Sequence, residues 1–182
     1  INAGGTSQGT LAVAIGSFAG ATTQKSLAVA IGSEAGSFNQ GLSAVAIGNS
    51  AANGVIGQGD GAIAIGKFAG RGTGTITGQG AGAIAIGNTA GNTTNTSDDQ
   101  GARAIAIGNA AASGTFAQNT DAIAIGTNAG AGGGGAGQGD SAIAIGNLAG
   151  VTNQVAGAVA IGKSAGNDNQ NDSAVAIGDS AG

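Results

Sequence analysis

Residues 83–91 read Ala-Ile-Ala-Ile-Gly-Asn-Thr-Ala-Gly, and this stretch decides the fold of the chain. The pattern Ala-Val/Ile-Ala-Ile-Gly-x-x-Ala-Gly/Ala occurs ten times in 182 residues, starting at Ala12, Ala28, Ala44, Ala62, Ala83, Ala104, Ala122, Ala142, Ala158 and Ala174. Successive motifs begin 16, 16, 18, 21, 21, 18, 20, 16 and 16 residues apart. Repeats of this length are typical of stacked coils, each of which cannot bury its apolar face alone. The sequence therefore predicts one tandem-repeat segment over residues 1–182.

The first four residues of each motif predict a short β-strand, because β-branched residues alternate with Ala and a Gly follows them. Side chains alternate between the two faces of a strand, so Val and Ile share one face and Ala the other. Neither face is polar, and a strand that is apolar on both faces is normally buried on both. We therefore expect an all-β, parallel β-solenoid of about ten coils of 16–21 residues, with a second chain packed against its strands.

Two facings of the strand fit this alternation. We place Val and Ile in the lumen of the solenoid and Ala toward the partner chain, while the reverse assignment fits the pattern nearly as well. Under the first assignment, the fourth motif residue forms the structural core in every coil, and the ten residues are Ile15, Ile31, Ile47, Ile65, Ile86, Ile107, Ile125, Ile145, Ile161 and Ile177.

A glutamine stands four residues before the first Ala of every motif. These residues are all the glutamines of the chain, namely Gln8, Gln24, Gln40, Gln58, Gln79, Gln100, Gln118, Gln138, Gln154 and Gln170. Stacked amide side chains can form a ladder along a solenoid, since each amide both donates and accepts hydrogen bonds. The alternative is that each Gln caps its own coil without contacting the next Gln. Either role is structural.

Glycine is invariant at the fifth motif position, from Gly16 to Gly178. An invariant Gly at the end of a strand indicates either a positive φ angle or a backbone crowded by its neighbour.

The composition excludes several classes of protein. His and Cys are absent, so the chain has no imidazole base, no imidazole ligand and no thiolate ligand. Five Lys and Arg against nine Asp and Glu give a net charge of −4, which argues against binding to nucleic acid or to anionic membranes. No apolar stretch is long enough to span a membrane. We expect no catalytic residues, no cofactor, no metal and no enzymatic activity.

The differences in repeat length all fall in the linkers between a motif and the next Gln. The longest linkers lie within residues 71–82, 92–103 and 131–141, and we expect them to bulge from the rod and to be a natural place for contacts.

Some polar residues of the linkers match known patterns. Asn92, Asn95 and Asn171 begin triplets that match the N-glycosylation signal. Residues 98–99 and 167–169 could offer oxygen atoms to Ca²⁺, although solvated turns are the favoured interpretation.

The four phenylalanines occupy two recurrent positions. Phe18 and Phe68 share a motif position with Leu148, whereas Phe38 and Phe116 both stand six residues before a motif. We expect them to pack at the corners of the coils, and exposed adhesive patches are the alternative.

Residues 43–48 and 173–178 both read Ser-Ala-Val-Ala-Ile-Gly. This block resembles the Ser-Val-Ala-Ile-Gly type signature of the head repeats of trimeric autotransporter adhesins, the YadA-like head. The resemblance recurs over essentially the whole chain. It implies a left-handed parallel β-roll, three chains around one axis, and an adhesive or spacer role on a bacterial surface. The repeats here are longer than is typical of that family, and similar repeats occur in fibres of phages and large viruses.

We therefore expect a non-enzymatic structural or adhesive segment of an extracellular, homotrimeric fibre at a cell surface. The alternative is a virion fibre domain of the same fold. The chain enters and leaves in the middle of a repeat, so we expect it to be part of a longer array. An ice-binding solenoid is disfavoured because Thr is scattered through the linkers. A sugar-cleaving solenoid is disfavoured because the recurrent Asp60, Asp140 and Asp172 lie coils apart.

Overall fold

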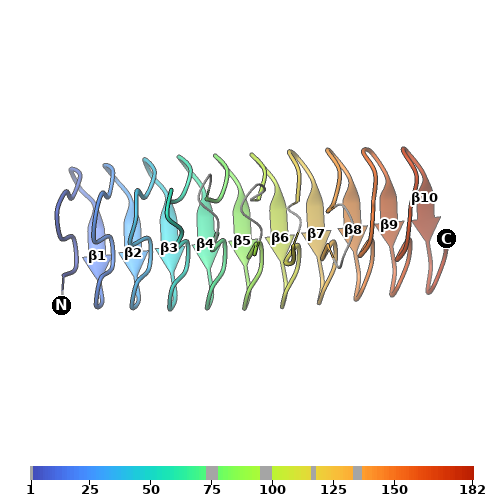
Figure 1. The fold of residues 1–182 in the computed structure, drawn as a ribbon, viewed down its shortest axis with the longest axis horizontal. Coiled ribbons are helices and arrows are strands. Elements are labelled where there is room, and N and C mark those ends of the chain that lie inside the picture. Colours follow the sequence, from blue (N-terminus) through green and yellow to red (C-terminus); the bar gives the residue numbers. More distant parts are fainter. Residues whose placement is uncertain (1, 73–77, 95–99, 116–117, 133–136) are drawn as a thin grey trace.

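The computed structural model describes residues 2–72, 78–94, 100–115, 118–132 and 137–182, and these form a stack of coils along one axis (Figure 1). Within these residues, ten three-residue strands follow one another in sequence order through a single parallel sheet. The strands are β1 (Val13–Ile15), β2 (Val29–Ile31), β3 (Val45–Ile47), β4 (Ile63–Ile65), β5 (Ile84–Ile86), β6 (Ile105–Ile107), β7 (Ile123–Ile125), β8 (Ile143–Ile145), β9 (Val159–Ile161) and β10 (Val175–Ile177). The predicted all-β, parallel β-solenoid is confirmed.

The register of the sheet places equivalent motif residues directly above one another. Ile84 pairs with Ile105, Ala85 with Ala106, and Ile86 with Ile107. Backbone hydrogen bonds continue this register past the strand end, where the Gly108 N–H donates to the Ile86 carbonyl at 2.8 Å. Because the motif has constant length, the differences in repeat length leave the pairing of the strands unchanged.

The lumen of the solenoid is lined by Ala. The middle residue of each strand, such as Ala85, is buried and packs with the eighth motif residue, such as Ala90, in one cluster that runs from Ala19 to Ala176. The Val and Ile side chains point out of the coil, so Ile125 and Ile145 are each 36% exposed in the single chain.

The placement of the isoleucines in the lumen is therefore wrong, and the reverse facing is the one that the structure has. The correction applies to the whole set of Ile15, Ile31, Ile47, Ile65, Ile86, Ile107, Ile125, Ile145, Ile161 and Ile177. The physical reason is space. The largest fully buried side chains are mostly glutamines, among them Gln24, Gln40 and Gln118. A narrow coil that already holds one Gln side chain has room only for methyl groups beside it.

The invariant Gly of the fifth motif position is required for two reasons at once. Gly126 has a φ of 132°, which L side chains rarely adopt, and a Cβ added there would lie 2.5 Å from the Gly146 carbonyl oxygen of the next coil. Both expected causes, the positive φ and the crowded backbone, therefore operate at this position.

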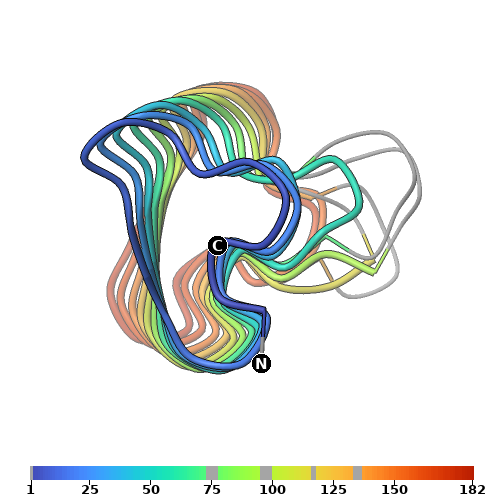
Figure 2. The same cartoon turned by 90° about the vertical axis from the view of Figure 1, so that its left-hand side faces the viewer.

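The coil has two distinct sides. In the view along the axis, the strands stack on one side, and the linker of residues 53–57 protrudes on the opposite side (Figure 2). The described part of the chain contains no helix that could cross a bilayer.

Replacing Gly126 by Ala should lower the free energy of unfolding clearly more than replacing Gly61 by Ala. Gly61 also has a positive φ, of 67°, but a Cβ there would meet no atom within 4 Å. The backbone strain costs on the order of 1–3 kcal/mol, and only Gly126→Ala adds a clash between coils. Chemical denaturation followed by circular dichroism measures both variants. Equal losses of stability would contradict the crowding argument.

Candidate functional site

The most regular feature of the lumen is the column of ten glutamines. From Gln24 onward, the Gln side chains are buried, whereas Gln8 is exposed. Each buried Gln binds two backbone carbonyls through its Nε2 group. Gln100, for example, donates to Ala104 O in its own coil at 3.2 Å and to Ile84 O of the preceding strand at 2.8 Å. The Gln side chain thus fastens each turn to the strand of the coil before it.

Six of the glutamines also donate to the next Gln. The Nε2 to Oε1 distances are 3.4 Å for Gln40 to Gln58, 3.1 Å for Gln58 to Gln79, 3.1 Å for Gln79 to Gln100, 3.3 Å for Gln100 to Gln118, 3.1 Å for Gln118 to Gln138, and 3.3 Å for Gln154 to Gln170. The structure therefore contains both arrangements that the sequence left open, because these amides cap their own coils and form a ladder.

The ladder follows the length of the linkers. Each Gln that comes after a linker of five or more residues accepts a bond from the preceding Gln. By contrast, three-residue linkers precede Gln24, Gln40 and Gln154, and among the described residues their buried Oε1 atoms accept no hydrogen bond. Gln170 follows a short linker and still accepts one. A change in linker length outside the lumen thus accompanies a change in bonding within it.

The outer face of the sheet carries the Val and Ile side chains in two parallel columns. They are half-buried along most of the rod, and they become exposed at its ends, where Ile15 is 58% and Ile177 is 65% exposed. The residue after the invariant Gly is polar in all ten coils, and this edge column is Ser17, Ser33, Asn49, Lys67, Asn88, Asn109, Thr127, Asn147, Lys163 and Asp179. The result is a continuous apolar strip with a polar edge, which is the composition of many protein interfaces.

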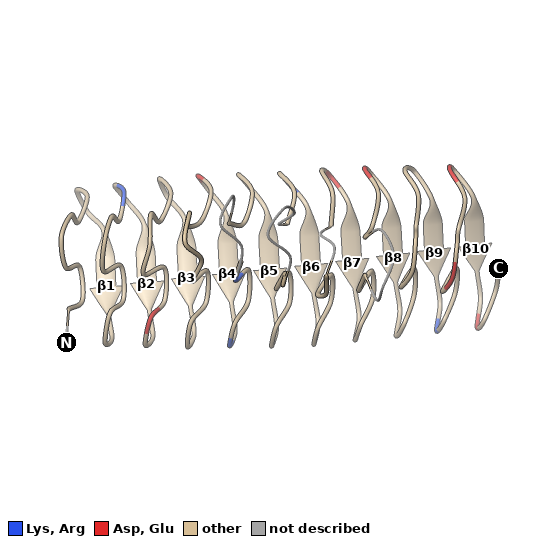
Figure 3. Ribbon diagram, viewed as in Figure 1, with Lys and Arg blue, Asp and Glu red and all other residues tan. Residues whose placement is uncertain are grey.

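The charged residues that the structure describes lie in the turns and linkers and not on the strands (Figure 3). Lys25 donates to Asp60 at 2.9 Å, and this bond, followed by one from the Leu42 N–H, lowers the pKa of Asp60. The bidentate bond from Arg103, at 2.6 and 2.7 Å, likewise lowers the pKa of Asp121. These pairs stabilise the fold above the unfolded-state pKa of about 3.9 and lose that contribution as the pH falls. All four side chains are exposed, so solvent keeps the contribution small.

The recurrent carboxylates Asp60 and Asp140 accept hydrogen bonds from backbone N–H groups. Asp60 accepts from the N–H of Leu42 at 2.8 Å, and Asp140 accepts from the N–H of Thr120 at 3.2 Å. In each case the donor stands at the same position of the preceding coil. Among the described residues, no group of three or more His, Cys, Asp or Glu could hold a metal ion.

The candidate glycosylation and Ca²⁺ sites from the sequence differ in their exposure and in whether the structure describes them. Asn171 is exposed and Asn92 is half-buried, whereas Asn95 and residues 98–99 lie outside the described part of the chain. Residues 167–169 follow a turn and are bonded to the neighbouring coil, with Asp168 in an isolated parallel bridge to Thr152.

The three described phenylalanines lie at the surface. Phe18 is 47% and Phe38 is 41% exposed, while Phe68 is half-buried beneath the cations of Lys67 and Arg71. Phe116 lies outside the described residues. The sequence did not reveal that these rings border hollows, because that depends on which residues the neighbouring coils place beside them.

Comparison with known protein families, with curated protein sequences and with solved structures finds no match for this chain.

Replacing Gln100 by Glu should destabilise the fold at pH 7. The carboxylate would face the carbonyls of Ile84 and Ala104 and could not donate to them. We expect a loss of roughly 1–3 kcal/mol or more. Because the folded state raises the pKa of this carboxyl, the loss should shrink as the pH is lowered and the group becomes protonated.

The matched control is Gln8→Glu, since Gln8 is exposed and bonds only to the Ala12 carbonyl among the described residues. Thermal unfolding of both variants between pH 4 and pH 8 measures the effect. An equal and pH-independent loss in the two variants would mean that the lumenal amide is not what holds the coils together.

Proposed function

We propose that this chain is a segment of an extracellular, homotrimeric fibre that displays or spaces an adhesive surface and has no enzymatic activity. The alternative is a virion fibre domain of the same fold. The resemblance to YadA-like head repeats supplies the number of chains and the expectation that each is a left-handed β-roll. The cell surface, or the virion surface, is then the place of action, and the partner of each chain is two further copies of itself.

The observation that carries the proposal is the apolar strip on the outside of the sheet. Ten strands spaced by about 4.8 Å make a strip about 48 Å long, and three residues give it a width of about 10 Å. An uninterrupted apolar surface of this size, roughly 500 Å², is at the upper end of what soluble monomers expose. A rod that stacks twenty Val and Ile side chains in register on one face is best explained by another copy that covers them.

The arrangement of the coil is compatible with three strips meeting at one axis. With the strands turned inward, the linkers lie on the outer side of the assembly, as the two sides of the coil in Figure 2 allow. The polar edge column would then border each apolar contact and remain hydrated. The outward side would carry the charged turns and the exposed phenylalanines, which are the groups available to an external surface.

Replacing Ile86 by Asp should dissociate the trimer while leaving the coil folded. Ile86 lies on the outer face of β5 and not in the lumen, so the charge would be buried only in the assembly, without a partner. Light scattering should give three times the chain mass of 16.5 kDa for the parent protein and a smaller mass for the variant.

The control for this variant is Asn88→Asp, which adds the same charge at an exposed position two residues away. It should leave the mass unchanged. A parent protein that is monomeric, or two variants that dissociate equally, would contradict the assignment of the strip to the trimer axis.

The choice between the cell-surface fibre and the virion fibre depends on genomic context. A membrane-barrel segment in the same gene would support the first role, and adjacent capsid or tail genes would support the second.

A further inference from the structure

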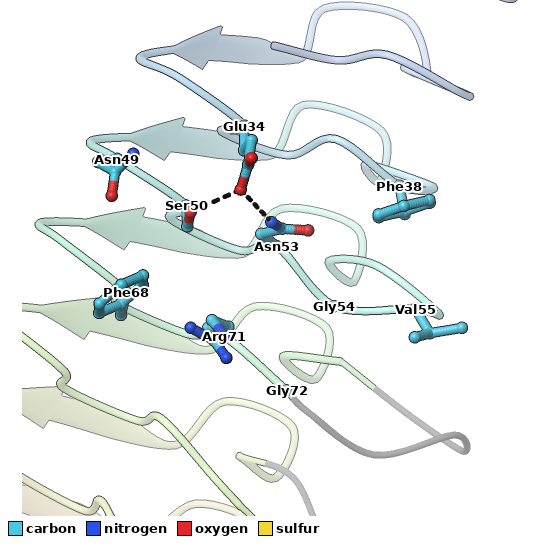
Figure 4. Close-up of a pocket in the computed structure, with 10 residues that line it drawn as sticks. All are labelled: Glu34, Phe38, Asn49, Ser50, Asn53, Gly54, Val55, Phe68, Arg71 and Gly72. Carbon is cyan, nitrogen blue, oxygen red and sulfur yellow. Dashed lines mark hydrogen bonds between the residues drawn. The ribbon is translucent and has the colours of Figure 1, made fainter. Parts of the chain in front are cut away.

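A hollow of about 590 Å³ opens at the corner of the coil that contains β3 (Figure 4). It lies where the seventh motif residues of three consecutive coils are Glu34, Ser50 and Phe68. All three have a positive φ, between 52° and 59°, and hold the corner in the same conformation. Ser50 is the smallest of the three, so the corner recedes between its two larger neighbours. The volume is in the range typical of small-ligand sites.

One wall of the hollow is a carboxylate held in a fixed position. The Oε2 atom of Glu34 accepts from Ser50 Oγ at 3.0 Å and from Asn53 Nδ2 at 3.1 Å, as Figure 4 shows. Asn53 is fixed in turn, because its Oδ1 accepts from Ser37 Oγ at 2.8 Å. Ser37 and Ser50 are both buried. Both bonds reach Oε2, so the other oxygen of Glu34 has no partner among the described residues and can accept from a ligand.

The opposite wall is cationic. The Arg71 guanidinium lies 4.8 Å and the Lys67 ammonium 5.0 Å from the centre of the Phe68 ring. Among the described residues, the ion pairs are Lys25 with Asp60 and Arg103 with Asp121, so neither Arg71 nor Lys67 has a carboxylate partner. Arg71 lines the hollow, and Lys67 stands beside the same Phe68 ring. In a chain with a net charge of −4, the unpaired guanidinium of Arg71 in this wall forms a local site for an anion.

The hollow continues along the rod. A second hollow of about 370 Å³ shares Glu34, Phe38 and Asn53 with the first and extends to Phe18. Phe38 and Val55 are 41% and 59% exposed beside this groove. The groove thus combines exposed apolar surface, a fixed acceptor and a cationic end.

We propose that this groove binds an acidic saccharide, with a sugar carboxylate at Arg71 and sugar hydroxyls at Glu34 and the neighbouring amides. Hydroxyl groups both donate and accept, which suits a wall of one carboxylate and asparagine amides. Guanidinium groups bind carboxylates through two parallel hydrogen bonds. The apolar C–H face of a sugar can lie against Phe38 or Val55. The combined length of the two hollows suits an oligosaccharide better than a single sugar.

The adhesive role of this groove rests on the proposed function, whereas the binding of one saccharide to one chain does not. In the proposed trimer, the groove lies at the corner of each coil, where Asn49 of the polar edge column lines one side of it, and it is repeated three times. Linked copies of a weak site can bind a multivalent surface far more tightly than one copy does.

The test is calorimetric titration of the parent protein with two acidic probes, sialyllactose and a glucuronate oligosaccharide, and with neutral lactose. We expect at least one acidic probe to bind and lactose to bind at least about tenfold more weakly, since a hydrogen bond to a charged group has that magnitude. The two acidic probes separate sialic from uronic acids as the source of the carboxylate. A peptide with a free carboxyl end tests the other class of ligand.

Two variants examine the site, each with a matched control. Arg71→Gln removes the cation and should weaken binding of the acidic probe at least about tenfold. Arg103→Gln removes a cation that is already paired with Asp121 and should leave the binding unchanged. Ser50→Leu fills the hollow and should abolish binding, while Asn128→Leu places the same side chain at the equivalent corner of another coil. Leu148 occupies this motif position naturally with a φ of 58°, so both Leu variants should fold.

Four results would overturn the proposal: no binding of either acidic probe, equal binding of lactose, equal or tighter binding of the peptide, or undiminished binding by Arg71→Gln or Ser50→Leu. Light scattering of the same samples reports on the trimer independently. A monomer that binds the acidic probe would refute the proposed fibre assembly and leave the saccharide site intact.

Discussion

The buried glutamine amide is the interaction on which this solenoid depends. Its Nε2 group donates to two backbone carbonyls in adjacent coils, so removing it would take a hydrogen bond from each of them in a space closed to water. The amide also occupies the lumen, and only methyl groups fit beside it. The narrow bore and the alanine lining both follow from one long polar side chain in every coil.

A lumen lined by alanine limits the apolar surface that one chain can bury inside its own coil. Alanine buries little apolar surface, and the larger Val and Ile side chains are left on the outer face of the sheet. The interior of one chain therefore holds the smaller part of the apolar side-chain volume of the motif. The arrangement differs from a globular domain, where the largest apolar residues are inside. This arrangement favours an assembly in which contacts between chains bury the outer Val and Ile side chains.

The sequence was sufficient to predict the strands, their order and their parallel stacking, because the motif has constant length and recurs ten times. The alternation of Ala with Val and Ile could not decide which face of the strand lines the lumen, since both faces are apolar. The alternation also carries no information on the width of the lumen. The invariant Gln was the missing signal, because a side chain of that length must lie inside to reach the backbone. The groove could not be predicted, because it depends on how Glu34, Ser50 and Arg71 from successive coils meet at one corner.

The interruptions of the glutamine ladder have a mechanical consequence. The amide bonds run without a break from Gln40 to Gln138, and the next step, from Gln138 to Gln154, has none among the described residues. The step from β8 to β9 therefore lacks the amide-to-amide bond that is present at each step from β3 to β8, and its coils are joined at the surface by a bond from Asn153 Nδ2 to Asn169 Oδ1 at 2.8 Å. In a rod pulled along its axis, the surface linkers would therefore carry part of the load at that step, where the middle of the rod carries it through the lumenal amides.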